Sequence, residues 1–212
     1  MNIFLIGKIY KFRNENNKLP ISRDYYGKLI TTIHSKLHRP HIVLFSNTKV
    51  YYLSVKTIKD NKNIEKTFSD KKNLIIQEKN VYSKKLKHPK IGNAINCSTI
   101  NVMDRVLFES LFEKGKPKNN YQIKPHLFDQ ILKTLFLNLK NDNIKYFEID
   151  SFDLVNQKTI WKPEYVALEN QKICSDFIIA YNKISEQEKT KLLHKPHIFF
   201  EWVREICLKM IQ

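Results

Sequence analysis

Apolar residues in the first half of the chain come in short runs that are rich in β-branched and aromatic side chains and are separated by polar breaks. Runs of this length and composition are typical of strands. We predict strands at Ile3–Phe12, His41–Phe45, Val50–Val55, Leu74–Gln77 and Ser98–Phe108. The polar segment Asn14–Arg39 has room for a short helix around Lys28–Lys36. Several short strands without helical periods between them favour a small barrel or a strongly bent sheet.

The spacing of apolar residues becomes helical after Gly115–Pro117. Within Lys124–Asp142 the apolar residues fall on one stripe at helical spacing, and Pro125 suits a first helical turn. We also predict helices at Tyr165–Lys183 and Pro196–Met210, a capping box at Ser185–Glu188, and a strand or loop at Lys145–Val155. The sequence therefore predicts an α+β fold, with a β-rich module at residues 1–118 and a mainly helical extension at residues 119–212.

The net charge is the feature of the composition that bears most directly on function. The chain has 37 Lys and Arg residues against 21 Asp and Glu residues, which gives a formal charge of +16. A field of this sign attracts phosphates, and RNA is the polyanion that we expect as the natural partner. An AT-rich genome also enriches Lys, but such a bias raises Glu together with Lys, and here the acidic residues lag behind.

Composition also argues against several classes of protein. A hydrophobic fraction of 42% argues against an intrinsically disordered chain. No run approaches the roughly 18 apolar residues of a membrane span, and the opening segment lacks a signal-peptide cleavage site, so we expect a cytoplasmic protein without a membrane partner. The three widely spaced cysteines fit reduced thiols. With only four glycines and no paired His or Cys motif, we expect no phosphate-binding glycine loop, no metal and no cofactor.

Basic and hydroxyl residues gather at the ends of two predicted strands. The segment His38–His41 leads into the second strand, and Lys56–Lys59 follows the third. Consecutive strands are commonly neighbours in a sheet, so we expect these two segments to lie side by side and to face one phosphate.

Four segments, in this order and spacing, resemble the small toxin endoribonucleases of the MazF/PemK (Kid) family and the related ToxN/AbiQ toxins over roughly residues 6–112. They are Ile6–Phe12, Arg39–Leu44, Leu53–Lys59 and Ile95–Arg105. The family's Thr-Ser pair would be Lys56-Thr57 here, and the helical extension has no counterpart in the family. The resemblance implies an SH3-like (PemK-like) β-barrel and a metal-independent cut of single-stranded RNA, in which the 2′-hydroxyl attacks the adjacent phosphate and leaves a 2′,3′-cyclic phosphate.

The resemblance also implies roles for individual residues. Arg39 would stabilise the phosphorane with its planar donors, and Thr57 would hold a phosphate oxygen. Lys59 would supply charge or transfer a proton, and His38 or His41 would act as base or acid. The residues expected to bind RNA outside the reacting centre are Lys8, Lys11, Lys56 and Arg105.

Other interpretations of the same residues stay open at this point. Asp104 and Arg105 also fit a structural ion pair at a strand end, and Trp161 and Trp202 fit core packing better than base stacking. A non-catalytic RNA- or DNA-binding module, or a protein-interaction module whose charge reflects genomic bias, would explain the composition without catalysis. The resemblance further implies an antitoxin, either protein or RNA, as a partner. Members of the MazF type are commonly homodimers and ToxN forms closed assemblies with its RNA, and the helical extension leaves the choice between these assemblies open.

Overall fold

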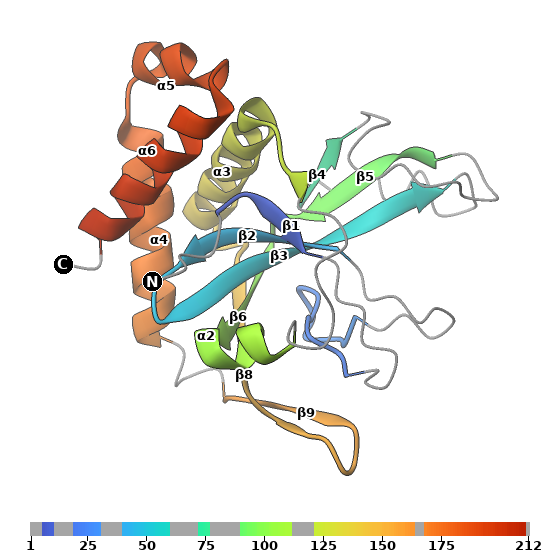
Figure 1. Cartoon of the computed structure of the whole chain (residues 1–212). Helices are drawn as coiled ribbons and strands as arrows, with labels where there is room; N and C mark the ends of the chain where they lie inside the picture. Colours follow the sequence, from blue (N-terminus) through green and yellow to red (C-terminus); the bar gives the residue numbers. More distant parts are fainter. Residues whose placement is uncertain are drawn as a thin grey trace.

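The computed structural model describes residues 6–10, 19–30, 40–59, 72–76, 90–111, 121–163 and 168–210. Nine strands form one mixed sheet, and a layer of helices lies on one of its faces (Figure 1). The strands are β1 (Lys8–Tyr10), β2 (His41–Ser46), β3 (Lys49–Lys59), β4 (Asn73–Ile76), β5 (Lys90–Asn96), β6 (Thr99–Asp104), β7 (Tyr121–Gln122), β8 (Lys145–Asp153) and β9 (Lys158–Trp161). The helices are α2 (Arg105–Ser110), α3 (Pro125–Lys140), α4 (Leu168–Lys183), α5 (Glu186–Leu193) and α6 (Pro196–Lys209).

The long strand β3 organises the sheet. On one side it pairs with β2, with His41 opposite Ser54. On its other side the first half of β3 pairs with β6 and the second half with β5, so that β5 and β6 follow one another along the same edge. β4 extends the sheet from β5, and β8 extends it from β6. The order through the main path is β7-β1-β2-β3-β6-β8-β9.

The mixed α and β composition is confirmed, but the predicted closed barrel is wrong for the residues that the structure describes, because their sheet is open. The edge of β6 that lies away from β3 is taken by β8, which runs parallel to it with Thr99 opposite Lys145. The apolar residues Tyr146, Phe147 and Ile149 of β8 are buried against the existing sheet. The extension thus adds strands to the sheet, so β6 cannot pair back to β1.

The helix layer covers one face of this sheet. The predicted stripe on α3 is confirmed, since Phe128, Ile131 and Leu135 are fully buried. They join one core cluster with β3, β6, α4 and α6. Burial of each large apolar side chain contributes about 1.5–3 kcal/mol, so this interface is a main source of stability. The predicted boundary at residues 118/119 therefore lies within one sheet and one core, since β7 also pairs with β1.

Several predicted elements agree with the structure in type but not in their ends. The predicted strand Ser98–Phe108 stops at Asp104, because the Asp104 carboxylate accepts hydrogen bonds from Val106 N (2.8 Å) and Leu107 N (3.4 Å) and caps α2. Strand β5 was not predicted. Lys145–Val155 is strand β8 as far as Asp153. Of the predicted helix Lys28–Lys36, residues 28–30 are not helical and the others lie outside the described residues.

The segment 19–30 lies on the face of the sheet opposite helices α3–α6, the face on which α2 also packs (Figure 1). Thr159 Oγ1 donates to Pro20 O at 2.7 Å, the Tyr52 hydroxyl donates to Ile21 O, and Arg23 N donates to Asn101 Oδ1 at 2.8 Å. These bonds attach the segment to β9, β3 and β6. We call this side of the sheet, together with residues 19–30, the loop face.

Candidate functional site

The two strand ends that carry the predicted reacting residues lie side by side, as expected. Val55 N donates to Pro40 O at 2.9 Å, and His41 lies opposite Ser54. His38, Arg39 and Lys11 lie outside the described residues. Thr57 and Lys59 belong to β3, opposite Asn93 and Lys90, but their side chains are outside the described part of the structure. Lys56 directly precedes Thr57 in β3, and its side chain is exposed.

His41 is buried beneath segment 19–30. Its imidazole is 1% exposed, Nε2 lies 3.4 Å from Ser22 Oγ, and the ring packs edge-on against Tyr52 at 5.3 Å. Burial also raises the pKa of Tyr52 well above its ordinary value, so that its hydroxyl stays protonated and donates to Ile21 O. In this arrangement His41 is a packing residue, and a proton transfer from it to bound RNA would require residues 21–22 to move.

Three cationic side chains lie on β3, next to β4 and in residues 19–30. Lys56 lies in one cross-strand row with Ala94 and Ile75, so the backbones of β3 and β4 are about 10 Å apart at this level. Lys72 directly precedes β4 and is half-buried, and its ammonium lies 3.3 Å from the ring centroid of Tyr25. Lys28, in the segment itself, is exposed. The fold thus brings Lys72 to residues 19–30, while Lys56 lies two strands away from β4.

Two tyrosines accompany Lys72. The rings of Tyr25 and Tyr26 are perpendicular, with centroids 5.5 Å apart, and the Lys72 ammonium lies 5.6 Å from the centroid of Tyr26. Tyr25 is half-buried under this cation, whereas Tyr26 is 86% exposed. A cation on the face of an aromatic ring is held by the ring's quadrupole, so Tyr25 fixes the position of the Lys72 charge.

A tight turn holds the tyrosines in place. Asp24 Oδ1 accepts hydrogen bonds from Tyr26 N (3.0 Å) and Lys28 N (2.9 Å), and Asp24 N donates to Lys28 O at 2.9 Å. Gly27 has φ +76°, a conformation that glycine adopts without strain. Arg23 and Leu29 form a bridge just below the turn. The turn is therefore fixed by its own hydrogen bonds.

The base of the turn rests on aromatic side chains of β8 and β9. The Arg23 guanidinium carbon lies 4.5 Å from the ring centroid of Trp161 and 5.5 Å from that of Phe147. The Trp161 ring packs against Phe147 at 6.5 Å, in agreement with the prediction that this tryptophan is a packing residue. The extension thus supplies the surface on which segment 19–30 sits.

Lys8 and Arg105, the other predicted RNA-binding residues, are not gathered at this cluster. Arg105 N bonds Thr48 O at the start of β3, seven strand residues from Lys56, which corresponds to a separation of about 20 Å. Arg105 Nε pairs with Glu109 at 3.3 Å, and the Asp104 carboxylate caps α2. Lys8 lies on β1, on the far side of β2 from β3.

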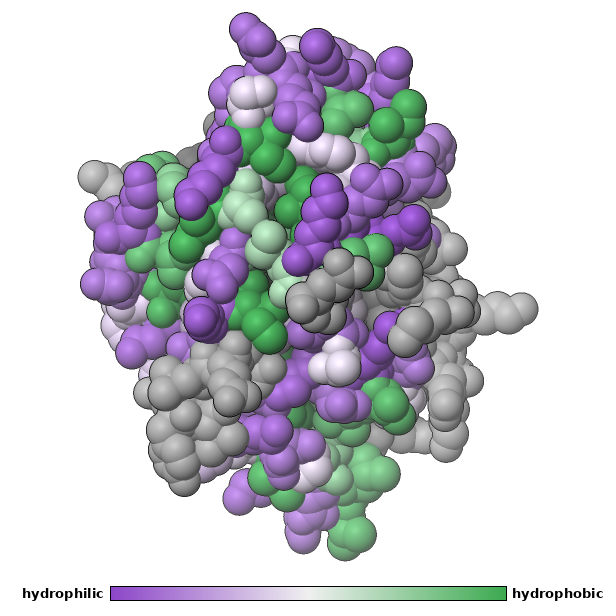
Figure 2. Space-filling model, turned by 90° about the vertical axis from the view of Figure 1, so that its left-hand side faces the viewer, coloured by the Kyte–Doolittle hydropathy of each residue, from purple (hydrophilic) through white to green (hydrophobic). Residues whose placement is uncertain are grey.

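Helices α3–α6 carry very little of the net charge. The four helices α3–α6 carry eight basic and seven acidic residues, so only +1 of the formal +16 belongs to them. The surface of this layer mixes hydrophobic and hydrophilic residues (Figure 2). The remaining +15 belongs to the rest of the chain, and +8 of it is carried by residues outside the described ranges. The positive field therefore originates outside the helix layer.

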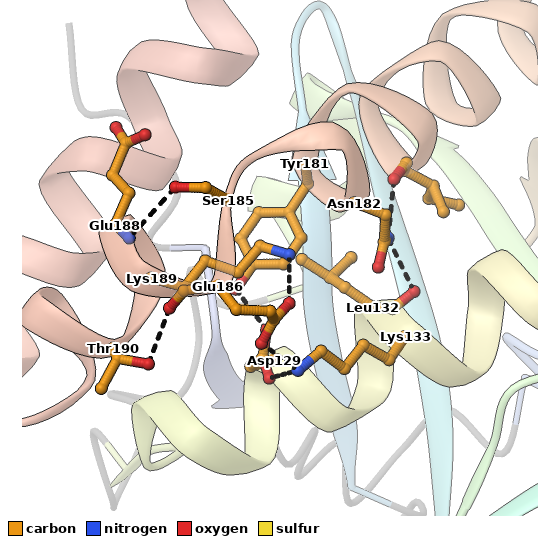
Figure 3. Close-up of polar contacts among 11 residues, drawn as sticks. Asp129, Leu132, Lys133, Tyr181, Asn182, Ser185, Glu186, Glu188, Lys189 and Thr190 are labelled. Carbon is orange, nitrogen blue, oxygen red and sulfur yellow. Dashed lines mark hydrogen bonds and ion pairs between the residues drawn. The ribbon is translucent and has the colours of Figure 1, made fainter.

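The helix layer has its own buried polar cluster (Figure 3). Lys189, 1% exposed, donates to Glu186 at 3.0 Å, and its ammonium lies 5.0 Å from the ring centroid of Tyr181. The Tyr181 hydroxyl donates to Asp129 at 2.9 Å, and Lys133 bridges Asp129 (2.9 Å) and Glu186 (2.8 Å). Each charge in this cluster has a partner of opposite sign, and the bonds join α5 to α3 and α4. The cluster is a structural anchor.

Sequence reasoning did not select Tyr25, Tyr26 or Lys72. The local signal was the Tyr-Tyr-Gly triplet inside a polar segment, where an aromatic pair has no strand or helix to pack into. Lys72 carried no local signal, because only the folded sheet brings it to Tyr25.

Comparison of the chain with protein-family models, with curated proteins and with solved structures finds no match. Within the described ranges, no three His, Cys, Asp or Glu side chains are grouped as metal ligands would be. No helix in the described part of the chain has both the length and the apolar character of a membrane span.

Proposed function

We propose that the protein binds RNA through its loop face. The observation that carries this proposal is the segregation of charge, with +1 on helices α3–α6 and +15 on the rest of the chain. Lys28 and Lys56 contribute exposed positive charge, and the Lys72 ammonium lies 5.6 Å from the ring centroid of the exposed Tyr26. Grooves or surfaces that combine cations with aromatic rings are typical of proteins that follow a nucleic-acid backbone.

Binding of this kind has a defined dependence on salt. Each lysine that neutralises a phosphate releases condensed counterions, so the logarithm of the binding constant falls linearly with the logarithm of the salt concentration. Lys56→Gln and Lys72→Gln should each weaken binding and reduce the slope by about 1. Lys191→Gln removes the same charge from α5 in the helix layer and serves as the matched control.

The test is fluorescence anisotropy with a labelled single-stranded RNA in EDTA across a salt series. The proposal predicts a loss of slope for Lys56→Gln and Lys72→Gln, and an unchanged slope for Lys191→Gln. Equal effects of all three variants would show that binding depends on the net positive charge of the protein and not on the loop face. A wild-type protein that shows no salt-dependent binding would refute RNA as the partner.

Cleavage of the bound RNA is a second candidate function, favoured by the adjacency of Pro40 and Val55. Pro40, which follows Arg39 in the sequence, therefore lies beside β3, the strand that carries Thr57 and Lys59. The proposed reaction is attack of the 2′-hydroxyl on the adjacent phosphate without a metal, as in the toxin endoribonucleases that the sequence resembles. An antitoxin stays a prediction of that resemblance, and the assembly, a homodimer or a closed complex with RNA, stays open.

Incubation of purified protein with mixed RNA in EDTA, followed by mapping of new ends, tests the reaction. Cleavage should leave 2′,3′-cyclic phosphates and should be lost in Arg39→Ala and Thr57→Ala, while both variants keep the wild-type circular dichroism spectrum. Intact RNA at a large excess of wild-type protein would contradict cleavage and leave binding alone as the function.

A further inference from the structure

We propose that Tyr26 is a stacking platform for one unpaired base, and that the loop face therefore selects single-stranded over duplex RNA. This role deepens the proposed RNA binding and depends on it. Tyr26 stands apart from the other aromatic residues that the structure describes on the loop face: Tyr25, Phe147 and Trp161 are all half-buried or buried, and Tyr26 is 86% exposed.

Tyr25 and Tyr26 have different roles in the proposed nucleotide site. The ring of Tyr25 is occupied by the Lys72 ammonium at 3.3 Å. The ring of Tyr26 is turned by 88° from that of Tyr25 and is directed into solvent. The same ammonium is 5.6 Å from the Tyr26 centroid. A base stacked on Tyr26 would thus have a fixed positive charge beside it for its own phosphate.

Hydrogen bonds within the turn hold the platform in place without a ligand. The Asp24 carboxylate bonds the backbone on both sides of the tip, at Tyr26 N and Lys28 N. Ile30 N donates to Ser22 O at 2.9 Å, and Arg23 pairs with Leu29, so the segment closes on itself. An ordered loop loses little conformational entropy on binding, which favours affinity from a small number of contacts.

Stacking on a protein ring requires a base whose face is free. Bases of a single strand can be turned out and stacked on an aromatic side chain, whereas duplex bases are already stacked on their neighbours. Phosphate contacts by Lys56 and Lys72 are available to both forms of RNA. The preference for single strands should therefore come from Tyr26 and the general affinity from the lysines.

The experiment compares a labelled 2′-O-methyl oligouridine with a 2′-O-methyl duplex of equal length, since neither carries the hydroxyl that cleavage needs. Variants Tyr26→Ala, Tyr26→Phe and Lys72→Gln are measured by anisotropy, with Val155→Ala as a control at a remote residue that is 93% exposed. Tyr26→Ala should weaken single-strand binding about tenfold and duplex binding less than twofold. Tyr26→Phe and Val155→Ala should bind both ligands as the wild type does.

The outcomes separate the platform from RNA binding itself. Single-strand affinity of Tyr26→Ala within twofold of the wild type, together with a weakened Lys72→Gln, would overturn the platform and leave RNA binding standing. Equal losses on single strands and duplexes would overturn the selectivity. Absence of salt-dependent binding in the wild type would overturn both proposals. Unchanged melting temperatures of the variants, expected from the exposure of Tyr26, show that losses are not due to unfolding.

Discussion

The Lys49 ammonium donates a hydrogen bond of 2.6 Å to the Glu148 carboxylate, although the two residues are 99 positions apart in the chain. Lys162 reaches the same carboxylate at 2.8 Å. Glu148 is 3% exposed, and both lysines pair with its buried carboxylate. The contact links the start of β3 to β8 and so connects the predicted N-terminal module to the predicted extension.

Replacement of Glu148 by Gln should destabilise the fold. The variant leaves two lysines beside a neutral amide, and loss of one partner of a buried ion pair is costly because the remaining charge stays desolvated. Since both lysines are partly exposed, we expect a loss of about 2 kcal/mol in the free energy of unfolding. Urea denaturation at pH 7 measures it, with Asp150→Asn on the exposed side of the same strand as control. Equal stability of wild type and Glu148→Gln would show that the pair contributes nothing.

The same carboxylate should make stability depend on pH in the acid range. Burial alone raises the pKa of Glu148, but hydrogen bonds from Lys162 and Lys49 outweigh it and hold the pKa below the ordinary 4.5. Stability from a lowered acid pKa is present above the unfolded value and is lost as pH falls through the folded value. The stability difference between wild type and Glu148→Gln should therefore shrink below about pH 4.5. A difference that stays constant from pH 7 to pH 3 would contradict this assignment.

The buried Lys189 should tolerate an apolar substitute better than the loss of its acidic partner. Lys189→Met removes a buried charge and retains most of the side-chain volume, so we expect a change within about 1 kcal/mol. Glu186→Gln leaves the Lys189 ammonium without its carboxylate and should cost about 1–2 kcal/mol. Thermal and urea unfolding of both variants and of the double variant measure the coupling. A double variant less stable than Glu186→Gln alone would contradict the expected rescue.

Two glycines with the same backbone conformation should differ in their tolerance of alanine. Gly7 and Gly27 both have φ +76°, where a Cβ costs about 1–2 kcal/mol. A Cβ on Gly27 would meet Phe147 at an ordinary 3.8 Å, but on Gly7 it would lie 2.2 Å from Phe200. Gly7→Ala should therefore cost about 3 kcal/mol or more and Gly27→Ala about 1–2 kcal/mol, as measured by urea unfolding. Equal costs would mean that the Phe200 ring moves aside freely.

The three cysteines should be unreactive in the folded protein. Cys97, Cys174 and Cys207 are all buried, and burial raises the pKa of the Cys97 thiol to about 12. The thiolate is the reactive form, so labelling by a disulfide reagent at pH 8 should require unfolding. We expect negligible labelling of the native protein and three labelled thiols in urea. A native thiol that reacts within seconds would contradict the burial.

Elements whose signals are local were predicted from the sequence. The stripe on α3, the proline at its first turn and the Ser185 cap of α5 each depend on neighbouring residues, and all three are present in the structure. Strand β5 was missed because Gly92, Asn93 and Asn96 have low strand propensity. Its conformation is imposed by β3 and β4 on its two sides.

The features that could not be predicted depend on contacts between residues that are far apart in the sequence. The open sheet depends on the parallel pairing of β6 with β8, and no local pattern encodes which strand occupies that edge. The adjacency of Pro40 and Val55 was predictable because β2 and β3 are consecutive strands joined by a short turn. The contact between Lys72 and Tyr25 was not, since it joins β4 to a segment without regular structure.

The position of α6 at the end of the described chain has a consequence for synthesis on the ribosome. The apolar face formed by β2, β3 and β6 is complete once Val102 has emerged, but Phe199 and Val203, which belong to the same core cluster, follow about 100 residues later. At 5–20 residues per second this delay lasts on the order of 10 s. Until then the core cluster lacks its last members, so the nascent chain exposes apolar surface that the folded protein buries.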